Sequence, residues 1–222
     1  MENAYQLTEF SDLSKEYGEY GRFYVGDQHC EHNAIAILSN PALQDFVRKS
    51  GKHVTVLTPQ VSELHFEKFT HLVRDYLEAA SRPEVVVNDF GMLRAFSGGP
   101  FEVVFGNVLV GQSKDPMIRE FSARETHVRI GIDLPFYQNL FRKAGISKAE
   151  VFNTFQGWQT TNLKDIDFHL HFPYVPYSQT RYCRISLESQ KKDYLEVVTD
   201  CRGCHSYGAK KLELDLAKRS EL

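Results

Sequence analysis

Short apolar segments that suit β-strands alternate along this chain with segments that suit α-helices. The strand-like segments are rich in β-branched and aromatic residues and read RFYVGD (22–27), HVTVLTP (53–59), EVVVND (84–89), FEVVFGN (101–107), HVRIGI (127–132), AEVFNTFQG (149–157) and DFHLHFP (167–173). Strands that alternate with helices are joined by right-handed crossovers and form a parallel sheet. The sequence therefore predicts an α/β fold, either an open sheet or a (β/α) barrel.

Helix boundary signals support the helical half of this pattern. In segment 40–51, Asn40 stands at the N-cap position, Pro41 lies in the first turn and Gly51 follows the last turn. Segment 62–80 places apolar residues 69, 72, 73, 76 and 77 on one face, as an amphipathic helix requires. Segment 133–145 reads as a capped helix that ends at Gly145, and shorter helices are expected at 90–96 and from residue 115.

The motifs of nucleotide-binding open sheets are missing from this sequence. No G-x-G-x-x-G follows an early strand, and G-x-x-x-x-G-K-[ST] does not occur. We therefore expect one TIM-barrel-like (β/α) barrel domain over residues 1–222, with a Cys-rich segment at 181–208. Functional residues of such barrels lie at the carboxyl ends of the strands. The residues at those ends are Asp27 to Cys30, Thr58, Asn88, Asp89, Asn107, Asp133, Gln156 and residues 174–183.

Composition narrows the possible environment and partners. Apolar residues make up 42% of the chain and charged residues 25%, which is typical of a globular protein. The formal net charge of −3 gives no bulk electrostatic sign of nucleic-acid binding. No apolar run reaches the length of a membrane span, and residues 1–27 lack the features of a signal peptide. We expect a cytoplasmic protein, in which cysteines stay reduced.

The chain has four cysteines, and three of them lie close together near its end. They are Cys30, Cys183, Cys201 and Cys204. The last two form C-x-x-C, a spacing at which two sulfurs can face one metal, and the first two follow strand ends on the expected active face. Four thiolates suit a [4Fe–4S] cluster or a Cys₄ zinc site. Zinc ribbons usually carry two C-x-x-C pairs, so one pair favours the cluster, with zinc as the alternative. A C-x-x-C with two unrelated buried cysteines is the remaining alternative, which the absence of any spare cysteine disfavours.

Four motifs accompany the cysteines: GDQHC (26–30), VVNDFG (86–91), FEVVFGNVLVG (101–111) and PYSQTRYC (176–183). With the cysteine order, they resemble the collagenase-like peptidase family, and within it the iron–sulfur proteins of anaerobic ubiquinone biosynthesis. The resemblance implies a [4Fe–4S] cluster on the four cysteines and oxygen-independent hydroxylation of an aromatic ring or nucleobase. Protease activity is not expected, because no Ser/His/Asp signature, H-E-x-x-H motif or nucleophile elbow is present.

The number of strands bears on assembly. Only one further strand-like segment, YLEVVTD (194–200), follows the segment at 167–173. A barrel short of strands leaves edges that invite pairing with another chain. We therefore expect a dimer, either with a second copy or with a related subunit. The alternative function is that of a non-catalytic assembly subunit that iron–sulfur or zinc stabilises.

A few polar residues have two readings each. Asp89, a candidate catalytic residue, could hold a substrate or cap the helix that follows it. Arg181, the other candidate, could bind a substrate carboxylate or balance the charge of the cluster. His169 and His171 alternate along a strand and so share a face, as a metal pair or as polar residues of a half-buried strand. His29 could donate a hydrogen bond to a cluster sulfur.

Overall fold

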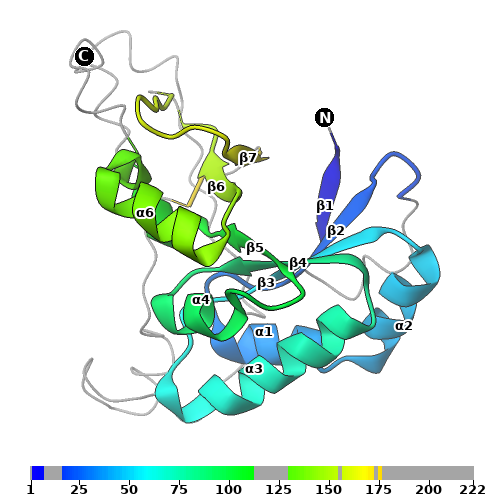
Figure 1. Ribbon diagram of the computed structural model, residues 1–222. Helices are drawn as coiled ribbons and strands as arrows, with labels where there is room; N and C mark the ends of the chain where they lie inside the picture. The colour runs from blue at the N-terminus through cyan, green and yellow to red at the C-terminus, as the bar shows by residue number, and fades with distance from the viewer. Residues whose placement is uncertain (1, 8–16, 113–129, 155–156, 173–174, 177–222) are drawn as a thin grey trace, which may run out of the picture. The chain divides into compact units, whose positions relative to one another are not determined.

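The computed structural model describes residues 2–7, 17–112, 130–154, 157–172 and 175–176 (Figure 1). These residues belong to a unit that spans Met1–Arg181. Arg181, Cys183, Cys201 and Cys204 lie outside the described residues, as do the strand-like segment 194–200 and the helix expected from residue 115.

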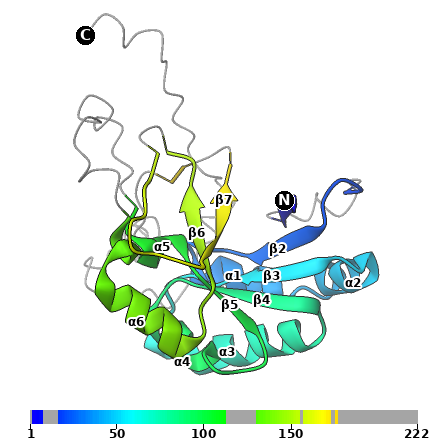
Figure 2. The same cartoon turned by 45° about the horizontal axis from the view of Figure 1, so that its top comes forward.

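Seven parallel strands form one curled sheet in which each strand pairs with the next in the chain (Figures 1 and 2). The strands are β1 (Ala4–Leu7), β2 (Arg22–Gly26), β3 (His53–Leu57), β4 (Ser81–Val87), β5 (Glu102–Phe105), β6 (Lys148–Phe152) and β7 (Asp167–His171). The curl brings the side chain of His169 on β7 within hydrogen-bonding distance of the side chain of Tyr24 on β2. The predicted α/β class and parallel sheet are confirmed, and the half-barrel is compatible with an incomplete (β/α) barrel.

Successive side chains along each strand point to opposite faces of the sheet, and the two faces differ in composition. The convex face packs on the helices in an apolar core that includes Phe23, Val56, Val85 and Phe105. The helices are α1 (Glu31–Leu38), α2 (Pro41–Ser50), α3 (Glu63–Glu78), α4 (Phe90–Phe96), α5 (Asn107–Val110) and α6 (Pro135–Ala144). The concave face holds a smaller apolar cluster of Tyr24, Leu57, Val86 and Val104.

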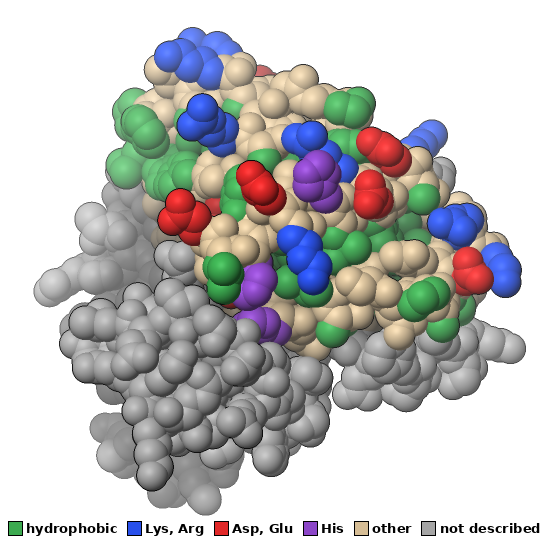
Figure 3. Space-filling model, turned by 90° about the horizontal axis from the view of Figure 1, so that it is seen from below, with side chains coloured by type: hydrophobic (Ala, Val, Ile, Leu, Met, Phe, Trp, Pro, Cys, Tyr) green, Lys and Arg blue, Asp and Glu red, His purple; other side chains and the backbone are tan. Residues whose placement is uncertain are grey.

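One face of the described part of the chain, seen from below in Figure 3, carries acidic and basic side chains that interleave. Scattered apolar side chains lie between them in the same view. A surface on which both signs mix agrees with the small net charge of −3 and differs from the basic stripe that nucleic-acid-binding faces carry.

The boundaries of α2 follow the signals in the sequence. Asn40 Oδ1 accepts a hydrogen bond from the N–H of Leu43 at 3.1 Å, and Pro41 opens the helix. Gly51 ends it with a φ of 64°, a left-handed conformation that costs glycine little. Helix α3 also lies where its apolar stripe predicts, and its Phe69, Val73, Tyr76 and Leu77 are buried.

The strand predicted at 127–132 is wrong over its described part, residues 130–132. Gly131–Asp133 forms a 3₁₀ turn, in which the N–H of Asp133 donates to the Ile130 oxygen at 3.0 Å. The N–H of Gly131 donates to the oxygen of Gly111, so residues 130–132 lie beside the end of α5 and are not among the described strands of the sheet. The sheet contains instead the strand β1, which was not predicted from the sequence.

Two glycines allow the strands to converge at their carboxyl ends. Gly26 has a φ of +118°, and a Cβ there would lie 2.5 Å from the backbone oxygen of Leu57. At Gly106 a Cβ would overlap the side chain of Asn88. The close approach that these glycines permit positions the polar residues at this edge of the sheet.

Candidate functional site on the concave face

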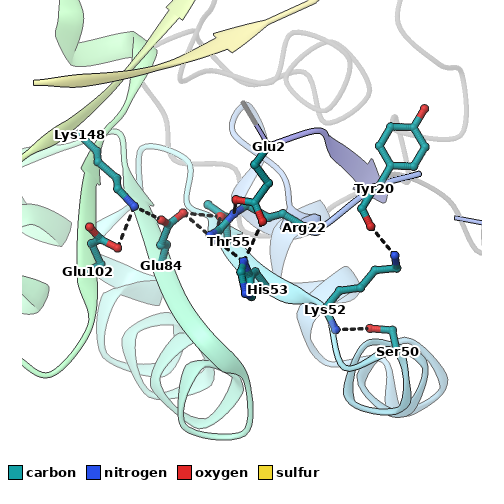
Figure 4. A network of polar contacts seen from close by, with 10 residues as sticks. All are labelled: Glu2, Tyr20, Arg22, Ser50, Lys52, His53, Thr55, Glu84, Glu102 and Lys148. Atoms are coloured by element: carbon teal, nitrogen blue, oxygen red, sulfur yellow. Dashed lines mark hydrogen bonds and ion pairs between the residues drawn. The ribbon is translucent and has the colours of Figure 1, made fainter. Parts of the chain in front are cut away.

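A buried charge layer occupies the amino-terminal half of the concave face (Figure 4). Arg22 Nη1 donates to Glu84 Oε2 at 2.7 Å and to Thr55 Oγ1 at 3.0 Å. Lys148 Nζ contacts the other carboxylate oxygen of Glu84, a residue that is only 1% exposed. Burial alone would raise the pKa of Glu84, but the Lys148 hydrogen bond and the Arg22 charge outweigh it and hold that pKa below its usual value. The charges of this layer are paired, which indicates a structural role.

The same layer ties the first strand to its neighbours. Glu2, which precedes β1, accepts a hydrogen bond from Arg22 Nε at 3.0 Å and contacts His53 Nδ1 at 2.7 Å. Lys148 also reaches Glu102 at 2.8 Å, so the network runs across the sheet from Glu2 to the start of β6.

A second polar group lies toward the carboxyl ends of the strands and centres on the fully buried Glu150. Glu150 Oε1 is 2.8 Å from His171 Nε2, and Oε2 accepts hydrogen bonds from the backbone N–H and Nδ2 of Asn107 at 3.3 and 3.1 Å. Asn107 Nδ2 also donates to Gln28 Oε1. Burial raises the pKa of Glu150, but the charge and hydrogen bond of His171 and the Asn107 donors together lower it. The ionised carboxylate of Glu150 on β6 therefore binds His171 on β7 and Asn107 after β5. Asn107 in turn connects it to Gln28 after β2.

Tyr24 and His169 form the adjacent pair, with 2.6 Å between Tyr24 Oη and His169 Nδ1. Burial, together with the charges of Glu150 and Glu84, raises the pKa of Tyr24 well above its ordinary value, so its hydroxyl stays protonated and is able to donate a hydrogen bond to Nδ1. Burial also lowers the pKa of His169. The imidazole is thus neutral, and a hydrogen bond donated by Tyr24 to Nδ1 would leave its proton on Nε2.

His169 and His171 share one face of β7, as the sequence predicts, but they bind different partners. His169 pairs with Tyr24 of β2, whereas His171 pairs with Glu150 of β6. Within the described ranges, no group of three or more metal-ligating side chains converges. The contacts favour the reading of two polar residues on a half-buried strand over the metal pair.

Cys30 lies at the carboxyl edge of the sheet, four positions after Gly26 at the end of β2, and stands at the N-cap of α1. Its Sγ accepts a hydrogen bond from the N–H of Asn33 at 3.4 Å. Asp27 shapes the preceding turn, because Oδ1 accepts the backbone N–H groups of His29 and Cys30 at 2.6 and 3.2 Å. Cys30 therefore fills the N-cap position that Ser, Thr, Asp or Asn occupies in most helices.

Of the two catalytic candidates, only Asp89 is described. Its Oδ1 accepts the N–H of Met92 at 2.7 Å and caps α4, and its Oδ2 accepts the N–H of Val61 at 2.9 Å. Both carboxylate oxygens thus bind backbone groups, as the capping reading requires. Asp89 also borders a surface depression of 590 Å³ whose lining includes Leu64 and Phe66.

Other polar residues predicted at the strand ends join the strands to their loops. Asn88 Nδ2 donates to the oxygen of Thr58 at 2.8 Å, and its Oδ1 accepts the N–H of Val108 at 3.2 Å. Asp133 does not cap α6. Its carboxylate accepts three backbone N–H groups of residues 161–163 and the hydroxyl of Thr161. Burial raises the pKa of Asp133, but these hydrogen bonds outweigh it and lower that pKa.

The sequence analysis missed the polar residues that lie inside the strands. Tyr24, Glu84, Lys148 and Glu150 stand within or beside apolar runs and were counted as strand residues only. A signal was present, because a charged side chain in a short buried strand needs a partner. Lys148 and Glu150 are two positions apart, so they share one face of β6. The strand positions that carry charged residues are therefore the ones that point to the concave face.

The fold and these contacts define an α/β half-barrel with a polar concave face. Comparison with models of known families, with curated proteins and with solved structures finds no match to this chain. None of the helices in the described part of the chain combines the length and the apolar character needed to span a membrane.

Proposed function

We propose that this chain binds a [4Fe–4S] cluster through Cys30, Cys183, Cys201 and Cys204 and acts as an oxygen-independent hydroxylase on a small aromatic ring or nucleobase. The observation that carries the proposal is the position of Cys30 at the carboxyl edge of a parallel half-barrel, where active sites of such folds lie. Zinc on the same four thiols is the alternative metal.

The surroundings of Cys30 fit a metal-binding thiolate. Its side chain is half-buried, and Sγ accepts a backbone N–H, as cluster sulfurs and thiolates commonly do. A bound cluster supplies one-electron redox chemistry. The residues of the chain itself supply the fixed turn at Asp27 that orients Cys30 and the polar concave face on the same sheet.

The concave face favours an enzyme over a purely structural assembly subunit. The interior of a (β/α) barrel is filled mainly with branched apolar side chains. Here Glu150, His171, Tyr24 and His169 bring ionised and neutral polar groups into that interior. Burying such groups is costly, and they are frequent where substrates bind.

The edges of the sheet support a dimer with a second copy or a related subunit. Within the described residues, β1 and β7 each pair with a strand on one side only. Edge strands present backbone donors and acceptors that another chain can use. Light scattering on the purified chain tests this part of the proposal, and a monomer with no tendency to associate would contradict it.

Anaerobic purification tests the cluster directly. We expect brown protein with about four irons and four sulfides per chain, the content of one [4Fe–4S] cluster. The variant Cys30→Ser should lose most of its iron, because one thiolate ligand is removed. Ala36→Ser is the matched control, since it introduces the same hydroxyl at an exposed position of α1. Colourless protein with one zinc per chain would replace the cluster with a zinc site.

Electron paramagnetic resonance separates the enzyme from the assembly subunit. In protein that holds the reduced cluster, an aromatic substrate that binds beside the cluster should change the paramagnetic resonance spectrum of the cluster. A spectrum that simple phenols and nucleosides leave unchanged would favour the assembly role.

A further inference from the structure

Two polar atoms on the concave face have no hydrogen-bond partner within the described part of the chain. One is Oδ1 of Asn107, a residue only 2% exposed, whose Nδ2 already serves Glu150 and Gln28. The other is Nε2 of His169, which belongs to a half-buried residue whose Nδ1 is bound to Tyr24. Buried polar atoms in native proteins nearly always have partners, so the buried acceptor of Asn107 indicates a missing occupant. The half-buried Nε2 of His169 is a second group that such an occupant could bind.

Both atoms belong to one cluster of side chains. Glu150 and His169 are register partners on the adjacent strands β6 and β7, so their side chains project from the same face about 5 Å apart. Glu150 Oε2 is bonded in turn to Asn107. His169 and Asn107 are therefore both neighbours of Glu150, one through the strand register and the other through a hydrogen bond. The hydroxyl of Tyr76 also lacks a partner, but it stands alone in the helical core.

We propose that this cluster binds a small uncharged molecule that presents a carbonyl oxygen beside an N–H group, as an amide does. The carbonyl oxygen accepts the proton of His169 Nε2, and the N–H donates to Asn107 Oδ1. His169 and Asn107 are the ligand-binding residues, and Tyr24 is a positioning residue that holds the tautomer of His169. The site needs neither a metal nor any cysteine, so its test does not depend on whether the proposed cluster is present.

The charges around the cluster favour an uncharged ligand. The carboxylate of Glu150 is paired with His171, and that of Glu84 with Arg22 and Lys148. Burial lowers the pKa of His169, although Glu84 and Glu150 act in the opposite direction, and Lys148 and Arg22 add to the lowering. A neutral imidazole whose orientation is fixed by a second residue is well suited to polarise a carbonyl group.

Nuclear magnetic resonance of the full chain with ¹⁵N-labelled histidine tests the site. The probe is benzamide, and methyl benzoate, which keeps the carbonyl but lacks the N–H, is its matched comparison. We expect the ligand-free protein to show His169 as the Nε2–H tautomer. Benzamide should shift its resonances saturably and bind about tenfold more tightly than methyl benzoate, because one more buried hydrogen bond is made.

Three variants separate the roles of the residues. Asn107→Leu should weaken benzamide about tenfold and leave methyl benzoate unchanged, since it removes only the acceptor for N–H. Tyr24→Phe should turn the His169 signals into a mixture of tautomers and weaken both probes. His71→Asn, which replaces an exposed histidine on α3, should change neither.

Circular dichroism checks that the variants fold, because Asn107 also bonds Glu150. If Asn107→Leu does not fold, Tyr24→Phe and the comparison of the two probes still decide the question. Benzamide that leaves His169 unshifted up to its solubility limit would overturn the proposal. Equal affinities for the two probes, or a His169 tautomer that Tyr24→Phe does not alter, would do the same.

Discussion

Replacing Glu84 with glutamine isolates the contribution of the buried charge layer. The substitution keeps the size of the side chain and removes its charge, while Arg22 and Lys148 keep theirs. The Arg22 side chain is only 9% exposed, and its remaining carboxylate partner, Glu2, is 40% exposed. Glu84→Gln therefore leaves a guanidinium group in a place from which water is largely excluded.

The expected loss of stability is large for a single isosteric change. Removing one partner of a buried ion pair typically costs about 3–5 kcal/mol, because the other charge stays buried. Glutamine keeps one oxygen that can accept a hydrogen bond, so we expect the lower end, about 3 kcal/mol. Glu102→Gln is the matched control, since Glu102 contacts the same Lys148 Nζ at 2.8 Å but its side chain is 47% exposed. Exposed pairs contribute about 0–1 kcal/mol.

Urea unfolding followed by circular dichroism measures both variants. With an m value of about 2 kcal/mol/M, Glu84→Gln should lower the midpoint by about 1.5 M. The pKa of Glu84 is lowered from 4.5 in the folded chain, so its stabilising effect is complete above pH 4.5 and is lost as the pH falls through the folded value. The gap between the wild type and Glu84→Gln should therefore stay constant near neutral pH and close in acid.

Two results would refute this reasoning about the charge layer. Equal midpoints for Glu84→Gln and Glu102→Gln would mean that burial does not set the cost. A gap that persists unchanged in acid would mean that the ionised carboxylate is not its source.

Further substitutions test other parts of the fold. Gly106→Ala should destabilise the chain by about 1–3 kcal/mol in urea unfolding, because its Cβ would overlap Asn88, and a smaller loss would mean that the strand end can move. Asp133→Ala should speed amide exchange at residues 161–163, which lose their acceptor. The pKa of Asp133 is lowered from 3.8, so in the wild type the protection of these amides, relative to their intrinsic exchange rate at each pH, should be lost only as the pH falls below that value. Protection that survives in acid would count against the ionised carboxylate.

Local signals in the sequence predict most of the sheet and the helices with clear caps. The strands β2 to β5 have continuous apolar runs, and Asn40 and Gly51 mark the ends of α2. β1 was not predicted, because only Leu7 among its four residues is buried and its alternation of apolar and polar residues is therefore weak. The apolar run at 130–132 reads as a strand, but the contact between Gly131 and Gly111 turns it into a 3₁₀ segment. Such tertiary contacts override local propensity.

The candidate site was predictable only in part, since its parts are separated in the chain. Strand-end residues such as Asn107 could be found from the parallel-sheet rule, and Cys30 lies at the edge where that rule expects it. The pairing of Tyr24 with His169 could not be predicted from the sequence, because 145 positions separate the two residues and the curl of the sheet decides whether they meet. Periodicity identifies which residues share a face, but it does not identify their partners across the barrel.

The strand order also determines when the concave face is completed during synthesis. Each strand pairs with its predecessor, so a growing chain can extend its sheet one strand at a time. The contact from Tyr24 to His169 must wait until β7 has been made. A nascent chain that ends just before Asp167 holds every strand from β1 to β6 and yet lacks one of the two ligand-binding residues. Binding competence on this face is thus acquired last, in the step that adds the seventh strand.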